Sequence, residues 1–362
     1  MNNHYMELAI KMAKETIGQT SPNPVVGCVI VNNGEIVGLG AHLKAGHEHA
    51  ERHALQMAEE KARGATMYVT LEPCSHHGRT PPCADAVIEA GISKVYIAST
   101  DPNPQVAGQG IERMRKAGIA VTLGIMQKEA DELNRVFFHY MKHSKPYVTL
   151  KMATSIDGKI ATSSGESKWI TGDEAREDGH RLRHKHDAIL VGVDTVIQDD
   201  PTLTTRLEQG GKNPIRIVMD RTLRTPLNAK LVTDNQASTW IVTTRSAHKQ
   251  KKRELEDLGV EIIVMDDDMI SISSMLTLLA EKDITSLLVE GGGQINDSFL
   301  RSNNFQSVVK YMAPILIGGE NARSSFSGNG ITNLNEAPRL EIKSMERIGD
   351  DVKFVFYKEG EK

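Results

Sequence analysis

The sequence is poor in cysteine, in long apolar stretches and in secretory signals, and each shortage excludes a class of protein. Three cysteines among 362 residues cannot build a disulfide framework, so a reducing compartment and a cytoplasmic location are expected. No apolar run approaches the ~20 residues of a membrane span. The N-terminus lacks a basic segment followed by an apolar core. Instead, the spacing of Met6, Ile10, Ala13 and Ile17 predicts an amphipathic helix.

An excess of charge of one sign is also missing. The chain has 43 lysines and arginines against 47 aspartates and glutamates, well mixed along its length, and a formal net charge of −4. Aromatic residues make up only 4%. A surface that binds nucleic acid or membrane needs a basic patch, so neither partner is expected. A chain of 362 residues predicts two domains.

The stretch from His47 to Cys83 contains a group of metal-binding residue types. It reads HEHAERHAL, then TMYVTLE, then PCSHHGRTPPC. Imidazole and thiolate are the ligands that tetrahedral zinc prefers, and three protein ligands leave a fourth position for water. A zinc-bound water ionises near neutral pH and becomes a nucleophile. The sequence therefore predicts a catalytic zinc site formed by His49, Cys74 and Cys83, with Glu51 beside the water as proton carrier.

Two simpler interpretations compete with this site. A cysteine next to a strand is commonly a small core residue, although two of the three cysteines here fall in one loop and each adjoins a proline. His49 and His53 lie one helical turn apart, but the H-E-x-x-H pattern of metalloproteases fails because Ala50 follows His49. Since residues two apart do not share a helix face, His49 and Glu51 can converge only at the first turn of a helix.

The first 145 residues predict a three-layer α/β unit, because strands alternate with helices. A hairpin with its turn at 32–34 comes first, and a helix is expected from about 49 to 63. The strand MYVTLE delivers Cys74 at its carboxyl end. Pro82 is expected to start the next helix, with Cys83 in its first turn, where the helix dipole stabilises a thiolate. A helix over 125–146 is expected to close the unit at Pro146.

Residues 146–362 predict a second α/β unit. Its strands, as in HDAILVG, NPIRIVM and TWIVTT, are continuous runs of apolar or β-branched residues, which is typical of strands buried on both faces. A polar helix over 247–257 is expected to face solvent. SLLVEGGGQINDSFLR predicts a strand, three glycines and a helix, an arrangement that lets a phosphate approach a helix N-terminus. The same glycines also suit a tight turn, and the G-x-G-x-x-G fingerprint is absent.

The zinc motif also carries a family resemblance. Zinc nucleoside deaminases have H-x-E followed by P-C-x-x-C, with the glutamate acting as general acid and base and not as a ligand. This chain has HAE at 49–51 and PC at 73–74, but SHHGRTPP stands where the pattern has two residues. With that basic, histidine-rich insertion, essentially the whole chain closely resembles the bifunctional riboflavin-biosynthesis deaminase–reductases.

The resemblance implies a fold, a cofactor and a reaction for each unit. Residues 1–145 look like a zinc cytidine-deaminase-like α/β/α domain that deaminates 2,5-diamino-6-ribosylamino-4(3H)-pyrimidinone 5′-phosphate. Residues 146–362 look like a reductase domain similar to dihydrofolate reductase, which uses NADPH to convert the ribosyl group to a ribityl chain. The cofactors would be one Zn²⁺ per chain and NADPH. A homo-oligomer is expected, although the residues do not fix its size.

Binding residues are also implied by the resemblance. In the deaminase unit, the pyrimidine and the phosphate are assigned to Asn23, His76, Arg79, Asp101 and Asn103. In the reductase unit, NADPH is assigned to Ala153, Trp169, Thr195, Asp199, Arg221, Gly292, Gly293, Gln294, Ile295, Asn296, Asp297 and Ser298. The reductase substrate is assigned to Ser167, Arg183, Leu203, Arg206 and Glu290.

Physical reasons support three of these positions and single out a fourth residue, Lys151. Arg221 follows the strand RIVMD, where a guanidinium can meet the 2′-phosphate that distinguishes NADP from NAD. Arg183 and Arg206 suit a phosphorylated sugar because guanidinium binds phosphate bidentately, although a surface ion pair is the simpler interpretation of each. Lys151 lies within the strand TLKMA, where a lysine needs a functional partner or a path to solvent. We expect it to be a proton donor or an orienting group of the reductase.

Three other functions fit parts of the sequence. A stand-alone nucleic-acid deaminase needs a basic, aromatic binding face, and 4% aromatic residues at a net charge of −4 argue against one. A monofunctional pyrimidine deaminase with a non-catalytic oligomerisation domain predicts that residues 147–362 do not bind NADPH. A zinc-stabilised scaffold without activity predicts four protein ligands, whereas the motif offers three.

Overall fold

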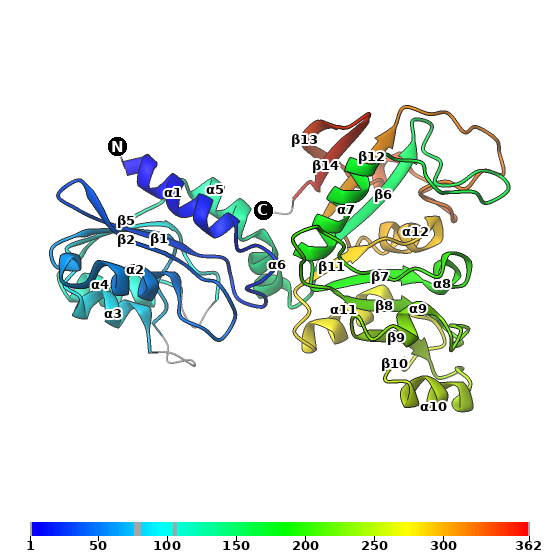
Figure 1. Ribbon diagram of the computed structural model, residues 1–362, viewed down its shortest axis with the longest axis horizontal. Coiled ribbons are helices and arrows are strands. Elements are labelled where there is room, and N and C mark those ends of the chain that lie inside the picture. Colours follow the sequence, from blue (N-terminus) through cyan, green and yellow to red (C-terminus); the bar gives the residue numbers. More distant parts are fainter. Residues whose placement is uncertain (1, 76–80, 104–106, 361–362) are drawn as a thin grey trace. The chain divides into compact units, whose positions relative to one another are not determined.

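A computed structural model describes residues 2–75, 81–103 and 107–360 (Figure 1). The chain divides into two compact units, Met1–Ser144 and Lys145–Lys362. Each unit contains one β-sheet. No helix in the described ranges combines the length and the hydropathy that crossing a membrane requires.

The sheet of the N-terminal unit has five strands in the order β2-β1-β3-β4-β5. β1 pairs antiparallel with β2 and β3, whereas β3, β4 and β5 are parallel. Asn33 and Gly34, with φ of 50° and 84°, form the turn between the first two strands, which confirms the predicted hairpin. The strands are β1 (Gly27–Asn32), β2 (Glu35–Ala41), β3 (Thr66–Leu71), β4 (Lys94–Ser99) and β5 (Ala120–Leu123).

Helices cover both faces of this sheet, so the predicted three-layer arrangement is confirmed (Figure 1). Alternate residues of β1 point to opposite faces: Cys28 and Ile30 pack with α2, α3 and α4, whereas Val29 and Val31 pack with α1 and α5. The helices are α1 (Asn2–Lys14), α2 (Ala50–Ala58), α3 (Cys83–Glu89), α4 (Gln109–Lys116), α5 (Gln127–Leu133) and α6 (Arg135–His143).

Two helices differ from the expected ranges. The helix expected over 49–63 ends at Ala58 and is followed by a 3-10 turn over Glu59–Ala62, because Glu59 adopts a left-handed φ of 49°. The helix expected over 125–146 is two helices, with Asn134 between them. The Asn134 side chain accepts a hydrogen bond from the Val25 amide and donates one to the Val25 carbonyl, both at 2.9 Å. This pairing with a distant segment fixes Asn134 at the break.

The C-terminal unit has a nine-stranded sheet in the order β10-β9-β8-β7-β11-β6-β12-β14-β13. The strands from β10 to β12 are parallel, and β14 and β13 add antiparallel pairs at one edge. The strands are β6 (Tyr147–Ser155), β7 (Ala188–Gly192), β8 (Ile215–Met219), β9 (Thr239–Thr244), β10 (Glu261–Met265), β11 (Ser286–Val289), β12 (Ser307–Ala313), β13 (Leu340–Ile348) and β14 (Asp351–Lys358).

Helices pack on both faces of the second sheet as well. One core joins the strands to α11 and α12, and the other joins them to α8, α9 and α10. Every residue of β7, β9 and β11 is buried, as their continuous apolar runs predicted. The helices are α7 (Asp173–Lys185), α8 (Val193–Asp199), α9 (Lys230–Thr233), α10 (Lys249–Asp257), α11 (Ile272–Glu281) and α12 (Gly293–Arg301), with a 3-10 turn over Leu334–Glu336.

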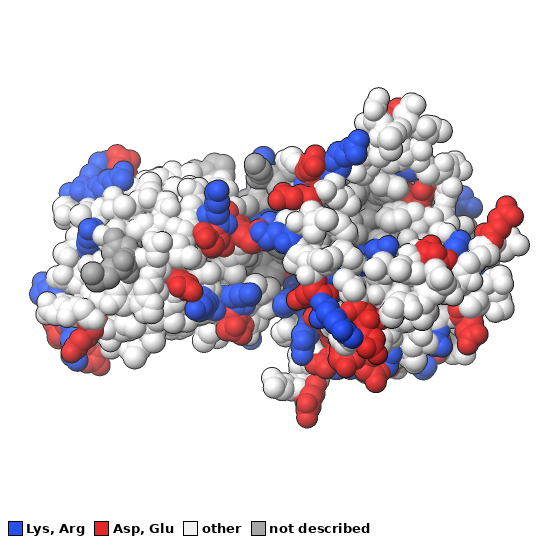
Figure 2. All heavy atoms as spheres, turned by 90° about the horizontal axis from the view of Figure 1, so that it is seen from above, with Lys and Arg blue, Asp and Glu red and all other residues white. Residues whose placement is uncertain are grey.

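The charged residues are distributed as the composition suggested. In α10 only Leu255 is buried, so this polar helix does face solvent. Figure 2 shows basic and acidic side chains interspersed over the face that it displays, with no broad region of one sign. The face seen there therefore offers no extended basic surface for a polyanion.

Candidate active sites

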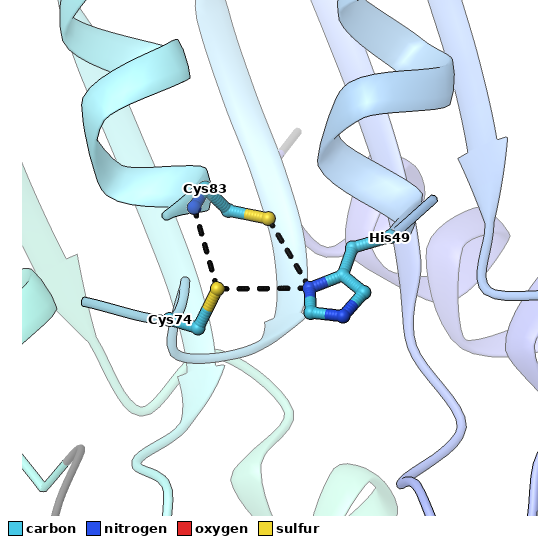
Figure 3. Close-up of side chains that lie close together, drawn as sticks. All are labelled: His49, Cys74 and Cys83. Carbon is cyan, nitrogen blue, oxygen red and sulfur yellow. Dashed lines mark hydrogen bonds between the residues drawn. The ribbon is translucent and has the colours of Figure 1, made fainter. Parts of the chain in front are cut away.

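Three metal-binding side chains converge in the N-terminal unit (Figure 3). His49 Nδ1 lies 3.6 Å from Cys74 Sγ and 3.3 Å from Cys83 Sγ, and the three ligand atoms all lie within 4.8 Å of one another. A tetrahedral zinc, with bonds of ~2.3 Å to sulfur and ~2.0 Å to nitrogen, holds such ligands about 3.5 Å apart. The donor types and the spacing of this group therefore fit one zinc ion, and the residues are those that the sequence predicted.

The local chain geometry explains why these residues meet. His49 is the N-cap of α2, in an extended conformation with φ of −79° and ψ of 164°. It therefore precedes the helix that carries Glu51, so the two side chains do not need to share a helix face. Cys74 follows β3, and Cys83 is the first residue of α3. The backbone amide of Cys83 donates a hydrogen bond to Cys74 Sγ at 3.3 Å.

The electrostatics of the group favour a cation. Hydrogen bonds from Cys83 and His49 outweigh burial and lower the pKa of Cys74 to about 4, so that thiol is anionic at neutral pH. The pKa of Cys83 is raised by its bond to Cys74 and by burial. Glu51 is only 3% exposed, and burial raises its pKa to about 7, with His49 opposing the shift. A divalent cation would let both sulfurs ionise together.

A second histidine links the metal ligands to a predicted substrate residue. The buried His42 packs its ring edge-on against His49, with ring centroids 5.2 Å apart. Its Nδ1 lies 3.0 Å from the Glu48 carbonyl, so it donates there, and its Nε2 accepts from Asn23 Nδ2 at 3.1 Å. The sequence analysis missed His42, because its position at the end of a strand carries no metal-ligand spacing.

Two other predicted deaminase residues, Asp101 and Asn103, follow β4. Asp101 follows this strand, and its Oδ1 accepts a hydrogen bond from the Asn103 amide at 2.8 Å. Cys74 and Asp101 thus follow neighbouring parallel strands, as expected for a site at the carboxyl edge of a sheet. His76 and Arg79, the two predicted residues of the insertion, lie outside the described residues.

In the C-terminal unit, predicted residues lie within or just after four neighbouring parallel strands. Ala153 lies in β6, Thr195 follows β7, Arg221 follows β8 and Glu290 follows β11. Because β8, β7, β11 and β6 are adjacent in the sheet, the carboxyl ends of these strands meet at one edge. This edge is where α/β sheets bind ligands.

The centre of this edge is a half-buried group of charges. Glu290 forms a bidentate ion pair with Arg183, with Nε–Oε1 and Nη2–Oε2 distances of 2.8 and 2.9 Å. Lys151 Nζ lies 3.5 Å from Glu290 Oε2, so this strand lysine has the partner that the sequence required. Burial alone would raise the pKa of Glu290, but Arg183 and Lys151 hold it well below its usual range. The nearby His180 has its pKa lowered to about 4 by burial and by Arg183.

The two arginines expected at a phosphate are in different environments. Arg183 also donates from Nη1 to the Thr204 carbonyl at 3.1 Å, so all three of its guanidinium nitrogens already have protein acceptors. Arg206 is exposed and donates to Thr202 Oγ1 at 3.2 Å. Arg183 is therefore engaged with Glu290, whereas the Arg206 side chain is open to solvent.

The glycine triplet serves two purposes. A side chain at Gly291 would meet Ile295, and one at Gly293 would meet Ser324 and Ser327, so these two glycines allow close packing within the protein. Only Gly292, the N-cap of α12, has open space next to its Cα. The first amides of a helix have no intrahelical acceptor, so this open side fits an anionic group such as a pyrophosphate.

The remaining cofactor and substrate residues divide between inward and outward side chains. Asn296 and Asp297 are buried; Asn296 donates to the Ser325 carbonyl, and Asp297 accepts from Arg301. Trp169 is 66% exposed, with the Arg176 guanidinium stacked 4.6 Å from its ring. The rest are half-buried Ser167, Thr195, Ile295 and Ser298, exposed Asp199 and Gln294, and buried Leu203.

Both units match known families. Residues 1–99 match the cytidine and deoxycytidylate deaminase zinc-binding region, and residues 146–354 match the RibD C-terminal domain. The riboflavin biosynthesis protein RibD of Bacillus amyloliquefaciens is 47% identical over 353 residues, which is 98% of this chain and 95% of that protein. The match of the second unit argues against a non-catalytic oligomerisation domain.

Solved structures agree over the full length. Acinetobacter baumannii RibD, form 1, superposes with a TM-score of 0.89 at 38% identity and covers 98% of both chains. A diaminohydroxyphosphoribosylaminopyrimidine deaminase/5-amino-6-(5-phosphoribosylamino)uracil reductase from Thermotoga maritima superposes with a TM-score of 0.88 at 36% identity and the same coverage. The chain therefore belongs to the RibD family of bifunctional riboflavin-biosynthesis enzymes, with a zinc-dependent deaminase domain and an NADPH-dependent reductase domain of dihydrofolate-reductase-like fold.

Proposed function

We propose that the N-terminal unit deaminates 2,5-diamino-6-ribosylamino-4(3H)-pyrimidinone 5′-phosphate at the His49–Cys74–Cys83 site, and that the C-terminal unit then reduces the ribosyl group. The observation that carries the first half is the convergence of three zinc ligands next to the buried Glu51. The second half is supported by the charged group of Lys151 and Glu290 at the carboxyl edge of the parallel sheet.

In the deaminase reaction, Glu51 moves the protons. A zinc ion held by His49, Cys74 and Cys83 would lower the pKa of a water to near neutrality and so would supply the nucleophile. Glu51 accepts the proton that this water gives up and transfers protons to the exocyclic amine, which leaves as ammonia. Asn23, Asp101 and Asn103 hold the pyrimidine and the ribosyl phosphate, and His76 and Arg79 are assigned to the same task by family likeness.

In the reductase reaction, charged side chains prepare the ribosyl group. NADPH supplies a hydride to the ribosyl carbon that is bonded to nitrogen. Breaking the bond from that carbon to the ring oxygen requires a proton at the oxygen, and we assign Lys151 as the donor. Glu290 fixes the position of Lys151 through their ion pair, and Arg183 fixes Glu290. Arg206 binds the substrate phosphate, with Ser167 and Leu203 lining the same site.

NADPH is assigned to the edge formed by β6, β7, β8 and α12. The open side of Gly292 suits the pyrophosphate, because a helix N-terminus favours an anion. Trp169 offers an exposed aromatic face. The other cofactor residues assigned by family likeness are Ala153, Thr195, Asp199, Arg221, Gly293, Gln294, Ile295, Asn296, Asp297 and Ser298.

The order of the two reactions can be tested by measuring ammonia and NADPH separately. With the diaminopyrimidine ribosyl phosphate as substrate, we expect ammonia release with or without NADPH. NADPH oxidation should follow ammonia release in a ratio of one to one. Oxidation of NADPH ahead of ammonia release would contradict the proposed order, and failure to release ammonia would contradict the deaminase assignment.

Arg221→Ala is expected to weaken NADPH binding while leaving NADH binding nearly unchanged. The Arg221 side chain is exposed just beyond β8 and contacts Met269 Sδ at 3.3 Å. A hydrogen bond from a guanidinium to the 2′-phosphate contributes about 1.5–3 kcal/mol, or roughly a 10- to 150-fold change in affinity. KM values for both cofactors, in the wild type and the variant, measure the effect.

Arg224→Ala is the matched control, because Arg224 is exposed in the same loop and pairs with Asp194 at 2.7 Å. It should leave the preference for NADPH unchanged. Equal losses for NADPH and NADH in Arg221→Ala would show that Arg221 does not read the 2′-phosphate.

A cytoplasmic location and a homo-oligomeric state complete the proposal. The three cysteines are free thiols in the described chain, which suits a reducing compartment. Sedimentation of the purified protein would test the oligomeric state.

A further inference from the structure

A buried carboxylate that the reaction scheme does not use lies two residues before a zinc ligand. Glu72 follows β3, precedes Pro73 and Cys74, and is 3% exposed. Its own backbone amide donates to the Ser99 carbonyl at 3.0 Å, which extends the pairing between β3 and β4. A buried carboxylate is retained only where donors replace its lost hydration. The hydrogen-bond donors that contact the Glu72 carboxylate therefore indicate its structural role.

Among the described residues, the donors to the Glu72 carboxylate are four backbone amides that follow β4. Oε2 accepts from Asp101 at 3.5 Å and from Gly108 at 3.0 Å, so one oxygen bonds both ends of the 101–108 loop. Oε1 accepts from Gly110 at 3.1 Å and from Ile111 at 3.3 Å, in the first turn of α4.

The loop adds two bonds of its own, from the Asn103 amide to Asp101 Oδ1 at 2.8 Å and from the Ala107 amide to the Asn103 carbonyl at 2.9 Å. Glu72 thus closes a ring of hydrogen bonds that begins at Asp101 and returns at Gly108. The chain also approaches closely here, because a side chain at Gly110 would collide with the Pro73 carbonyl.

We propose that Glu72 is a positioning residue of the deaminase: it holds Asp101, and through it Asn103, at a fixed distance from the zinc ligands. This inference rests on the proposed assignment of those two residues to the substrate. A carboxylate accepts four hydrogen bonds with two oxygens, whereas an amide side chain accepts with one oxygen and presents N–H groups on the other side. Glu72→Gln therefore loses the bonds of one oxygen without a change of size.

The expected result for Glu72→Gln is a split between KM and kcat. Hydrogen bonds to a charged group are strong, and losing those that hold Asp101 and Asn103 in place should weaken substrate binding. The deaminase KM should therefore rise about 10- to 100-fold, with kcat changing far less. Zinc content and the reductase rate on pre-deaminated substrate should stay at wild-type values. Glu112→Gln is the matched control. This exposed glutamate lies on α4, the helix that also carries Gly110 and Ile111, and among the described residues it pairs only with Lys116.

Hydrogen exchange provides a readout that does not depend on activity. The amides of Gly108, Gly110 and Ile111 should exchange faster in Glu72→Gln than in the wild type and in Glu112→Gln. If Glu72→Gln does not fold, Gly110→Ala carries the test, since its added methyl group separates α4 from Pro73 and should raise KM in the same way.

Unchanged exchange together with unchanged KM would overturn the inference. Loss of zinc with collapse of kcat would also overturn it, because Glu72 would then support the metal ligands and not the substrate loop. Absence of ammonia release from the wild type and from Glu112→Gln would instead contradict the proposed function, and the exchange measurement would still decide the role of Glu72.

Discussion

Glu51→Gln is expected to reduce deamination by about 10²–10⁴-fold, the usual contribution of a general acid–base group. Glu51 is buried beside the three ligands but is not one of them, so we expect its carboxylate to move protons and not to hold the metal. Glutamine keeps the size of the side chain and cannot accept and return a proton. Ammonia release measures the loss, while zinc content and the reductase rate on pre-deaminated substrate should be unchanged.

Glu60→Gln is a suitable control for this variant. Glu60 is exposed in the 3-10 turn that follows α2, so it reports the effect of removing a carboxylate from the same segment. It should deaminate at the wild-type rate. A loss of less than about tenfold in Glu51→Gln would be incompatible with general acid–base catalysis by this residue.

Cys74→Ser is expected to abolish zinc binding and deamination together. Cys74 Sγ lies 3.6 Å from His49 Nδ1 and accepts the Cys83 amide at 3.3 Å, so it is bonded to both other ligand residues. A serine hydroxyl remains protonated at neutral pH and is a poor ligand for zinc, which leaves two good ligands where three are needed. Metal analysis after dialysis should fall from one zinc per chain to nearly none.

Cys28→Ser separates the loss of a ligand from the general effect of this substitution. Cys28 is fully buried in the N-terminal core and is not part of the ligand group. Its variant should keep one zinc per folded chain even if its stability falls. Full zinc retention in Cys74→Ser would rule out the assignment of Cys74 as a ligand.

The ligand group could be predicted because its residues occupy positions with local rules. His49 precedes a helix, Cys74 follows a strand and Cys83 starts a helix, and each of these positions is visible in the sequence as a periodicity change or a proline. The conflict over His49 and Glu51 was resolved in the same way, because an N-cap lies outside the helical repeat.

The residues that hold the site together could not be predicted. Glu72 bonds to backbone amides 29 to 39 positions away, and Asn134 to a backbone 109 positions away, and a backbone donor leaves no mark in the sequence. For the same reason the two helices around Asn134 were expected to be one. The sequence indicated that Lys151 needs a partner, but it did not identify that partner as Glu290, which is 139 residues away along the chain.

The three glycines at 291–293 are present for different structural reasons, although the surrounding strand, turn and helix were predicted correctly. The strand, turn and helix were predicted, and the N-terminus of α12 does have an open side at Gly292. Gly291 and Gly293, however, are required by Ile295 and by Ser324 and Ser327. Three glycines in a row carry no information about which of them faces a ligand and which faces the protein.

Removing zinc from the wild-type enzyme tests most directly whether one chain carries two chemically independent sites. After treatment with a chelator and dialysis, ammonia release from the diaminopyrimidine ribosyl phosphate should be lost, and added zinc should restore it. The rate of NADPH oxidation with pre-deaminated substrate should not change, because the one group of metal-binding side chains found among the described residues lies in the N-terminal unit. Deamination by zinc-free enzyme, or a fall of both activities together, would contradict the account.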